Sequence, residues 1–291
     1  MGSVDLVLRF HYHVGMSPEN RSPTSFEDVD GSAGALGLVA YLDIVDDLPL
    51  AQAYKADALK LLAPEPGCRL LEIGCGTGEN SRILARHVGS GGRVVGVDVS
   101  ATMVETARRR SRDSLLPTEF HVADAGSLDF ADESFDAACA DRVFQHVEAP
   151  EQAVREMARV VRSGGRIVVS EPDWGTLVVD HPDQKLVRRV LRALCDQVRQ
   201  GWIGRRLPTL FKSAGLEVLA AQAYTLTIDN LDLADELFGL TAAAVRAYEA
   251  EDLTGEETAQ WIASLRAAAA KDRFFSSLTG FMVCGQRPID L

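Results

Sequence analysis

The chain has 291 residues, 46% of them hydrophobic and 25% charged, which is typical of a globular protein with a substantial core. Its formal net charge of −12 argues against nucleic acid as the main partner, because an acidic surface repels a polyanion. No apolar run approaches the ~18 residues of a membrane helix, and no secretion signal is recognisable, so we expect a cytoplasmic protein without a membrane span.

The cysteines are widely spaced, and no Cys-x-x-Cys pair occurs. This pattern favours buried, reduced thiols over a disulfide framework or a metal site. Two histidines, His11 and His13, flank Tyr12, but two ligands alone are a weak metal signal. We therefore expect no bound metal.

Residues 1–34 are expected to form a flexible N-terminal arm, because residues 17–32 are polar and rich in turn-forming side chains. Two helices are predicted over residues 35–66. The first ends at Pro49, and the second ends at Pro64 and Gly67.

From residue 67 onward, apolar runs alternate with helical segments. Strands are predicted at 69–74, 93–99, 118–124, 135–141 and 166–172, and helices at 80–89, 100–113 and 149–165. Strands of this kind separated by helices predict a parallel sheet covered on both faces. Right-handed crossovers then give a doubly wound α/β domain, in which ligands bind beyond the carboxyl ends of the strands.

After Pro172 the helices become more frequent. The pattern predicts a helix at 181–202, a helix and a strand within 205–228, two helices within 232–270 and a closing strand at 273–288. We expect one domain over 67–291, with helical insertions at about 176–203 and 232–270 that form a cap.

A glycine-rich turn follows the first predicted strand, in the stretch LLEIGCGTGENS at residues 70–81. The dinucleotide fingerprint G-x-G-x-x-G needs a small residue where this chain has Glu79, and a carboxylate there would repel a pyrophosphate. No Lys-Ser or Lys-Thr follows the glycines, which excludes a P-loop. The turn therefore predicts a ligand without phosphates.

Acidic side chains lie at three successive strand ends. Glu72 precedes the glycines, Asp98 ends the second strand and Asp124 ends the third. A carboxylate after the second strand can accept hydrogen bonds from ribose hydroxyls, and one after the third can accept from an adenine amino group. Asp98 could instead cap the helix near Ser100, and Asp124 could be a turn residue. Together they favour a phosphate-free adenosine ligand such as S-adenosylmethionine (SAM).

The stretch from Leu70 to Asp173 resembles the core of the class I SAM-dependent methyltransferases. The segments LLEIGCGTG, VVGVDVSATMVETAR and VADAGSLDFADESFDAACADRVFQHVEAP follow the order and spacing of that family. The nearest subgroup is the ubiquinone/menaquinone-biosynthesis-like set, which includes natural-product tailoring enzymes. The resemblance implies a seven-stranded Rossmann-like sheet with an antiparallel last strand, SAM as cofactor and S-adenosylhomocysteine (SAH) as product. Ser163 replaces the usual proline before two glycines, but that turn needs only the glycines.

The resemblance also implies which residues hold SAM. The glycines would line its methionine part, Asp98 would bind the ribose, and Asp141 and Arg142 would meet the amino-acid end. Val99 and Met103 would flank the adenine, although Met103 is equally well explained as core. The implied set is Glu72, Gly74, Gly76, Gly78, Asp98, Val99, Met103, Asp124, Ala125, Asp141 and Arg142.

Two side chains could accept a proton from a hydroxyl acceptor. His146 follows the fourth strand and Asp173 follows the fifth, so both can face one cleft. A histidine with its ordinary pKa of ~6.5 can act as a base near neutral pH. His146 could instead be a helix-entry residue bonded to backbone, and Asp173 a turn acid.

An apolar acceptor pocket is expected near the same strand ends, with Trp174, Phe144 and Tyr41 as the candidate contacts. The N-terminal helices and the 232–270 insertion would form a lid. The leading hypothesis is a methyltransferase that acts on a hydroxyl of a lipophilic or glycosylated metabolite in natural-product biosynthesis. A carbon or nitrogen acceptor, or a cofactor-binding protein without transfer, are the alternatives. A homo-oligomer is compatible with the sequence.

Overall fold

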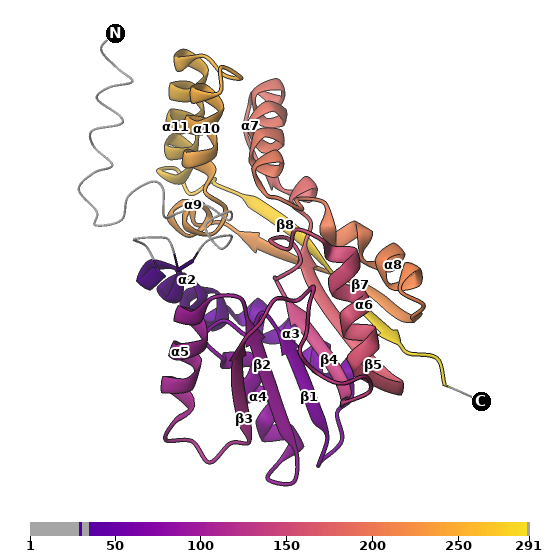
Figure 1. Cartoon of the computed structure of the whole chain (residues 1–291). Coiled ribbons are helices and arrows are strands. Elements are labelled where there is room, and N and C mark those ends of the chain that lie inside the picture. Colours follow the sequence, from indigo (N-terminus) through magenta and orange to yellow (C-terminus); the bar gives the residue numbers. More distant parts are fainter. Residues whose placement is uncertain (1–28, 31–34, 290–291) are drawn as a thin grey trace.

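The computed structural model describes residues 29–30 and 35–289 (Figure 1). The expected arm at 1–34 therefore lies outside the described residues, except for Val29 and Asp30. The two predicted N-terminal helices are confirmed as α2 (Ala35–Asp47) and α3 (Pro49–Leu62). Pro49 occupies the first turn of α3, where its missing N–H costs no hydrogen bond. Ala63, in the left-handed region at φ 46°, ends that helix.

The centre of the molecule is a parallel sheet, as predicted. Its parallel strands are β1 (Arg69–Ile73), β2 (Arg93–Asp98), β3 (Thr118–Val122), β4 (Phe135–Asp141) and β5 (Val161–Pro172). The order across the sheet is β3-β2-β1-β4-β5-β8-β6, and β7 pairs with β8. The switch in order between β1 and β4 opens a crevice at the carboxyl ends of the strands, where doubly wound folds bind ligands.

The last strand is antiparallel to its neighbours, as expected. β8 (Ser276–Gln286) lies between β5 and β7 (Glu217–Ile228) and runs antiparallel to both. The two-residue strand β6 (Val178–Val179) also pairs with β8. The described sheet thus has eight strands rather than seven, because the chain after β5 briefly rejoins it.

The helix predicted over 149–165 is too long. α6 (Pro150–Val160) ends at Val160, and the chain continues directly into β5. A Cβ on Gly165 would lie 2.5 Å from the carbonyl oxygen of Asp136 in β4. Gly165 therefore allows β5 to lie close to β4, Gly164 adopts a left-handed conformation at φ +72°, and neither serves as a helix stop.

Helices cover both faces of the sheet, and neighbouring strand residues point to opposite sides. Leu70 belongs to a buried cluster with Leu84 of α4 (Glu79–Val88), whereas Leu71 packs in a second cluster with Met157 of α6. α5 (Ala101–Ser111) packs beside β2 and β3, and α8 (Ile203–Ser213) packs on β5, β7 and β8. This two-sided burial explains why the strands read as continuous apolar runs.

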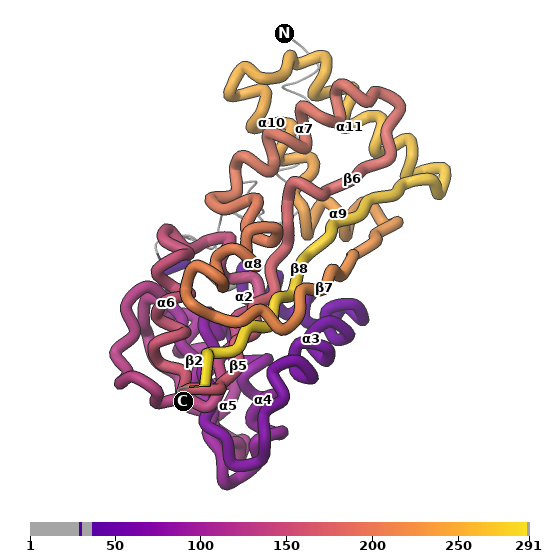
Figure 2. Tube along the Cα trace, turned by 90° about the vertical axis from the view of Figure 1, so that its right-hand side faces the viewer, coloured from indigo at the N-terminus to yellow at the C-terminus, as the bar shows by residue number. Residues whose placement is uncertain are grey.

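The remaining helices gather beyond the carboxyl end of β5 (Figures 1 and 2). They are α7 (Gln184–Gln197), α9 (Leu231–Phe238), α10 (Leu240–Glu249) and α11 (Gly255–Ala269). Residues 231–270 hold three helices instead of the predicted two, because Gly239 in the left-handed region ends α9 and starts α10. No helix within the described ranges is long and apolar enough to cross a membrane.

All five cysteines are free thiols, and only Cys68 is partly exposed. The expectation of reduced thiols is confirmed for these side chains. Across residues 29–30 and 35–289, no group of three or more His, Cys, Asp or Glu side chains has the arrangement of a metal site.

Candidate active site

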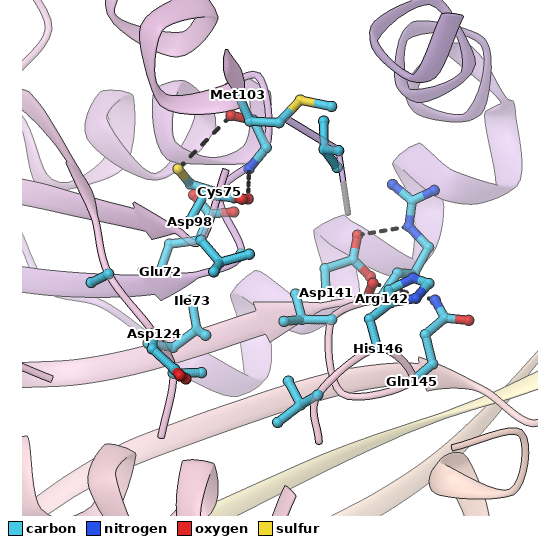
Figure 3. A pocket seen from close by; sticks show the side chains of 18 of the residues that line it. Glu72, Ile73, Cys75, Asp98, Met103, Asp124, Asp141, Arg142, Gln145 and His146 are labelled. Carbon is cyan, nitrogen blue, oxygen red and sulfur yellow. Dashed lines mark hydrogen bonds and ion pairs between the residues drawn. The ribbon is translucent and has the colours of Figure 1, made fainter. Parts of the chain in front are cut away.

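A cavity of about 610 Å³ lies at the carboxyl ends of β1 to β4 (Figure 3). Its volume is in the range of small-molecule sites. The glycine turn after β1, the ends of β2 and β3, and the turn after β4 line it, and α2 and α3 close one side. Of the residues implied to hold SAM, all except Gly78 line this cavity.

The glycine turn is held between two neighbouring segments. Gly74 has φ +64°, and a Cβ there would overlap Val143 in the turn after β4. Gly76 has φ +50°, and its N–H donates to Asp98 Oδ2 at 2.9 Å. Both positions therefore favour glycine for its backbone conformation.

Gly78 has a packing role instead of a cavity role, which corrects the expectation for this residue. It precedes α4 with φ +79°, and a Cβ there would lie 2.9 Å from Phe120 Cζ and 3.0 Å from Ala107 Cβ. Glycine at this position lets α4 start close to β3 and α5.

Asp98 links the glycine turn to the start of α5. Its Oδ1 accepts from the Ser100 N–H at 2.9 Å, while Oδ2 accepts from Gly76. The N-cap of α5 is Ser100, whose hydroxyl accepts from the Met103 N–H at 3.1 Å. Asp98 is thus not the helix cap. Burial raises the pKa of its carboxyl group.

The side chains expected around the adenine lie on the same wall. Val99 is exposed toward the cavity, whereas Met103 is almost fully buried and packs with Leu38 and Val29. Asp124 lines the cavity next to Ala125, and its Oδ1 accepts from the Gly126 N–H at 2.8 Å. Asp124 therefore combines the two roles considered for it, a turn residue and a cavity residue.

Asp30 also belongs to this wall and was not anticipated. Its carboxylate accepts from Ser100 Oγ at 2.6 Å, from the Ala101 N–H at 2.7 Å and from the Thr102 N–H at 3.1 Å. The hydrogen bond from Ser100 lowers the pKa of Asp30 to about 2. An acid at the N-terminus of a helix is stabilised by the free N–H groups and by the helix dipole. The sequence gives no sign of this contact, because Asp30 lies 70 residues before Ser100.

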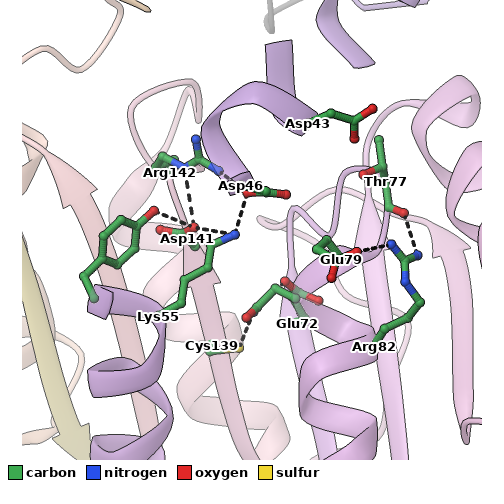
Figure 4. A network of polar contacts seen from close by, with 12 residues as sticks. Asp43, Asp46, Lys55, Glu72, Thr77, Glu79, Arg82, Cys139, Asp141 and Arg142 are labelled. Carbon is green, nitrogen blue, oxygen red and sulfur yellow. Dashed lines mark hydrogen bonds and ion pairs between the residues drawn. The ribbon is translucent and has the colours of Figure 1, made fainter. Parts of the chain in front are cut away.

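Four charged side chains form a network where α2 and α3 meet the end of β4 (Figure 4). Lys55 Nζ lies 2.6 Å from Asp46 Oδ1 and 3.7 Å from Asp141 Oδ2. Arg142 Nη2 lies 3.2 Å from Asp46 Oδ1, and its Nε lies 3.4 Å from Asp141 Oδ2. All four residues line the cavity. Two cations and two carboxylates compensate one another, which makes their burial tolerable.

Asp141 has one buried oxygen without a partner among the described residues. Its Oδ1 accepts no hydrogen bond, whereas Oδ2 also accepts from the Tyr54 hydroxyl at 3.0 Å. Arg142, the next residue, has φ +58°, a conformation that costs energy for a residue with a Cβ. A ligand ammonium group at Asp141 Oδ1 would satisfy the unpaired oxygen.

Glu72 lies under the glycine turn and is almost fully buried. It accepts from Asn80 Nδ2 at 2.9 Å and from the Ser81 hydroxyl. Burial raises the pKa of Glu72 to about 7, and the two hydrogen bonds oppose that shift.

The opposite wall carries the candidate acceptor residues. His146 lines the cavity, and its N–H donates to the Val143 carbonyl at 2.9 Å, as a helix-entry turn requires. Beside it, Gln145 Oε1 accepts from Trp174 Nε1 at 2.8 Å. Trp174 also lines the cavity, and it packs edge-on against Phe238 of α9. Tyr41 of α2 contributes from the other side.

Phe144, expected at the acceptor, lies elsewhere. Its side chain is fully buried in the core cluster formed with α6 and α8, and it does not line the cavity. The turn after β4 therefore points Phe144 into the core and its neighbours Gln145 and His146 into the cavity.

Asp173 is not available as the second proton acceptor, which corrects the expectation for this residue. It is fully buried and forms a two-point ion pair with Arg205, at 2.6 Å to Nε and 2.5 Å to Nη2. It also accepts from the Arg205 N–H at 3.0 Å. A carboxylate held by three donors fixes the start of α8 and does not line the cavity.

Glu171 is the residue that sequence reasoning missed on this wall. It is fully buried at the end of β5 and accepts from the N–H groups of Val143 and Phe144 at 2.6 Å each, and of Gln145 at 3.3 Å. Burial raises the pKa of Glu171 to about 8. Only its place two residues before Asp173 marks it in the sequence.

Comparisons with known proteins place the chain in a family. A family profile described as "Methyltransferase domain" covers residues 71–169. An uncharacterised 37.1 kDa protein of transposon Tn4556 from Streptomyces fradiae is 39% identical over 85% of this chain and 71% of its own length. The methyltransferase GfsG of Streptomyces halstedii is 33% identical over 59% of this chain and 62% of its own. The ubiquinone/menaquinone biosynthesis C-methyltransferase UbiE of Pseudomonas savastanoi is 32% identical over 55% and 63%.

The chain belongs to the class I SAM-dependent methyltransferases. Solved structures agree on the fold: the YcgJ protein of Bacillus subtilis superimposes with a TM-score of 0.58, at 21% identity, over 82% of this chain and all of that one. SAM is the methyl donor of this family. The chain spans somewhat less than two thirds of GfsG and UbiE.

The residues of the cavity fit SAM. The unpaired Asp141 Oδ1 offers an acceptor for its ammonium group, and the glycine turn lets the backbone approach its methionine part. Asp98 and Asp124 line the cavity at the ends of β2 and β3, as expected for the residues implied to meet the adenosine part. Three of the contributing side chains, Tyr41, Asp46 and Lys55, precede the segment that the family profile matches. Sequence reasoning recognised only Tyr41 among them, because charged residues in helices usually face solvent.

Proposed function

We propose that this methyltransferase acts on a hydroxyl oxygen of a small natural-product metabolite, with His146 as the general base. A neutral hydroxyl is a poor nucleophile, so its proton must be accepted as the new bond forms. The placement of His146 carries this proposal. Its side chain lines the same cavity as the glycine turn and stands next to Gln145, the partner of Trp174 (Figure 3).

The proposed roles of the other residues follow from their places. When bound, SAM supplies an electrophilic methyl group and a neutral leaving group. Trp174 and Tyr41 would orient the acceptor and keep water away from its oxygen, which favours loss of the positive charge. His146 would take the hydroxyl proton and release it to solvent after product leaves.

We also propose that the helices beyond β5 act as a cap that selects the acceptor. This assigns residues 67–291 to the methyltransferase domain, with insertions at about 176–203 and 232–270. The contact of Trp174 with Phe238 supports the assignment, because it joins the cavity wall to α9.

The test is a methyl-transfer screen of hydroxylated macrolides, glycosides and quinols with radiolabelled SAM, followed by a comparison of variants on the best acceptor. His146→Ala should lower kcat by about 10²- to 10⁴-fold while SAH affinity stays unchanged. His87→Ala, which alters an exposed histidine of α4, is the matched control. A kcat for His146→Ala within twofold of the wild type, on an oxygen acceptor, would refute the base role.

Carbon methylation is the second candidate, because one of the relatives is a C-methyltransferase. An enolisable carbon is acidified by its own carbonyl group and depends less on a base. A product with a new C–CH₃ bond, formed at nearly the same rate by His146→Ala, would select this candidate over oxygen transfer.

A further inference from the structure

Two buried carboxylates flank Pro172 at the end of β5, and each holds a different segment of the cavity. Asp173 holds the start of α8 through Arg205, as described above. Glu171 holds the turn after β4, and neither carboxylate lines the cavity. Neither Glu171 nor Asp173 can therefore touch the substrate in the proposed transfer.

The turn held by Glu171 connects both halves of the site. At one end, the Val143 side chain fills the space that a Cβ on Gly74 would occupy, so Val143 holds the glycine turn in place. At the other end, Gln145 accepts from Trp174 and donates through Nε2 to the Arg142 carbonyl at 3.3 Å. His146 directly follows Gln145. A shift of this turn would move the base, the aromatic wall and the edge of the cofactor site together.

The N–H groups of this turn depend on Glu171, because Val143, Phe144 and Gln145 donate to no other acceptor among the described residues. The N–H groups of Val143, Phe144 and Gln145 are successive, and they converge on the two oxygens of Glu171. N–H donors that converge on an ionised carboxylate form short, charge-assisted bonds, roughly twice as strong as neutral ones, so the turn is held most firmly when Glu171 is ionised. An unpaired buried N–H would cost about 1–3 kcal/mol.

We propose that Glu171 is a positioning residue for methyl transfer: it fixes the backbone of residues 143–145 and thereby the placement of His146 and of the Gln145–Trp174 pair. This inference rests on the proposed function for the role of His146, but the placement itself is independent of that role. Burial raises the pKa of Glu171 to about 8, so a titration near that pH reports on the ionisation of this carboxyl group.

The substitution Glu171→Gln tests the proposal because it preserves shape and removes one acceptor. A carboxamide has one acceptor oxygen and one NH₂ group. Whichever way it points, its NH₂ group faces an N–H of the turn, and the turn must shift. Glu171→Asp keeps the carboxylate but shortens the side chain by one methylene group. This variant replaces Glu171→Gln in the experiment if the glutamine variant does not fold. Asp136→Asn is the control, since Asp136 accepts from the Arg69 N–H at the other end of β4.

The first measurement is a pH titration of the SAH complex followed by NMR. The protein carries ¹⁵N in its backbone and labelled histidine side chains, so that amide and imidazole signals are both recorded. The chain has six histidines, and His146→Ala assigns the resonance of interest. We expect the amide signals of Val143 and Phe144 to titrate with Glu171 in the wild type and not in Glu171→Gln. We also expect the His146 ring resonance to move in Glu171→Gln and in Glu171→Asp, and to stay in Asp136→Asn. A folded Glu171→Gln variant with an unchanged His146 resonance would overturn the proposal.

The second measurement is a double-mutant cycle on the acceptor found by the screen. Glu171→Gln should lower kcat by about 10- to 100-fold, since a small misplacement of a catalytic group has effects of that size. In the His146→Ala background it should add little, because residues that act through one another are not additive. Fully additive losses would mean that Glu171 acts apart from His146 and would contradict the positioning role. If His146→Ala transfers at the wild-type rate, the base role fails, and the NMR titration still decides whether Glu171 places the turn.

Discussion

The hydroxyl of Tyr54 donates a hydrogen bond to Asp141 Oδ2 over 3.0 Å, which ties α3 to the end of β4. Tyr54 is held in place by a stacked contact with Tyr224 of β7, at 4.4 Å between ring centroids. With Oδ2 held in this way, the buried Oδ1 of Asp141 is the oxygen left without a partner among the described residues. The N-terminal helices therefore hold a carboxylate of the sheet in the cavity wall.

Tyr54→Phe should weaken SAH binding and lower stability together. The substitution removes one hydrogen bond to a charged group, worth about 1.5–3 kcal/mol, while the ring stacking remains. Calorimetric titration with SAH and thermal unfolding measure the two effects. Tyr248→Phe, which alters an exposed tyrosine of α10, is the control. Unchanged SAH affinity in Tyr54→Phe would show that Asp141 does not depend on α3 for its orientation.

Asp98→Asn should reduce SAH affinity by about tenfold, equivalent to ~1.4 kcal/mol. An amide can keep only one of the two backbone N–H groups that Asp98 accepts, so the glycine turn and the start of α5 lose their common anchor. Titration with SAH and with NAD⁺ measures the change, and NAD⁺ should not bind to either protein. If Asp98→Asn bound SAH with wild-type affinity, Asp98 would have no part in cofactor binding.

Glu72 predicts a specific dependence of stability on pH. Burial raises the pKa of Glu72 in the folded protein from 4.5 to about 7. Between these two pH values the folded state therefore holds a proton that the unfolded state has lost. The contribution of Glu72 is then fully present below about pH 4.5 and is lost as the pH rises through 7. At ~1.4 kcal/mol per pKa unit, the rise from 4.5 to about 7 corresponds to a loss of at most about 3.5 kcal/mol.

Glu72→Gln should remove this component of the pH dependence. The amide can accept from Asn80, and the Ser81 hydroxyl can rotate to accept from it. Urea unfolding at several pH values between 4 and 8 compares the two proteins, with Glu217→Gln at an exposed strand end as the control. Parallel pH profiles for wild type and Glu72→Gln would mean that Glu72 stays ionised in the folded protein.

Asp173→Asn should destabilise the fold by about 1.5–3 kcal/mol, because a neutral amide at this fully buried position cannot accept from all three Arg205 donors. Glu151→Gln is the matched control: it breaks the pair of the next arginine, Arg206, which is exposed at both ends and should change stability by less than ~1 kcal/mol. Equal losses of unfolding free energy for the two substitutions would show that the Asp173–Arg205 pair contributes no more than the exposed Glu151–Arg206 pair.

The sequence predicted the sheet and its ligand edge well because both depend on local patterns. The apolar strands and the glycine turn recur at fixed spacing, and Asp98 and Asp124 lie at strand ends that any parallel sheet brings together. The misplaced residues depend on contacts between distant segments. Asp173 pairs with Arg205, 32 residues later, and Glu171 meets a turn 26–28 residues earlier. The two-glycine sequence at 164–165 misled for a similar reason, since its close packing on β4 does not show in the local sequence.

The network around Asp141 divides the lining of the cavity between two parts of the chain. A fragment that started at residue 67 would retain the sheet strands, the glycine turn and Asp98. It would lose Lys55, Asp46 and the Tyr54 hydroxyl, and Asp141 and Arg142 would face water. Chains that share the same central segment can therefore differ in how tightly they retain SAH, and in how readily they exchange it between turnovers, through changes confined to their first sixty residues.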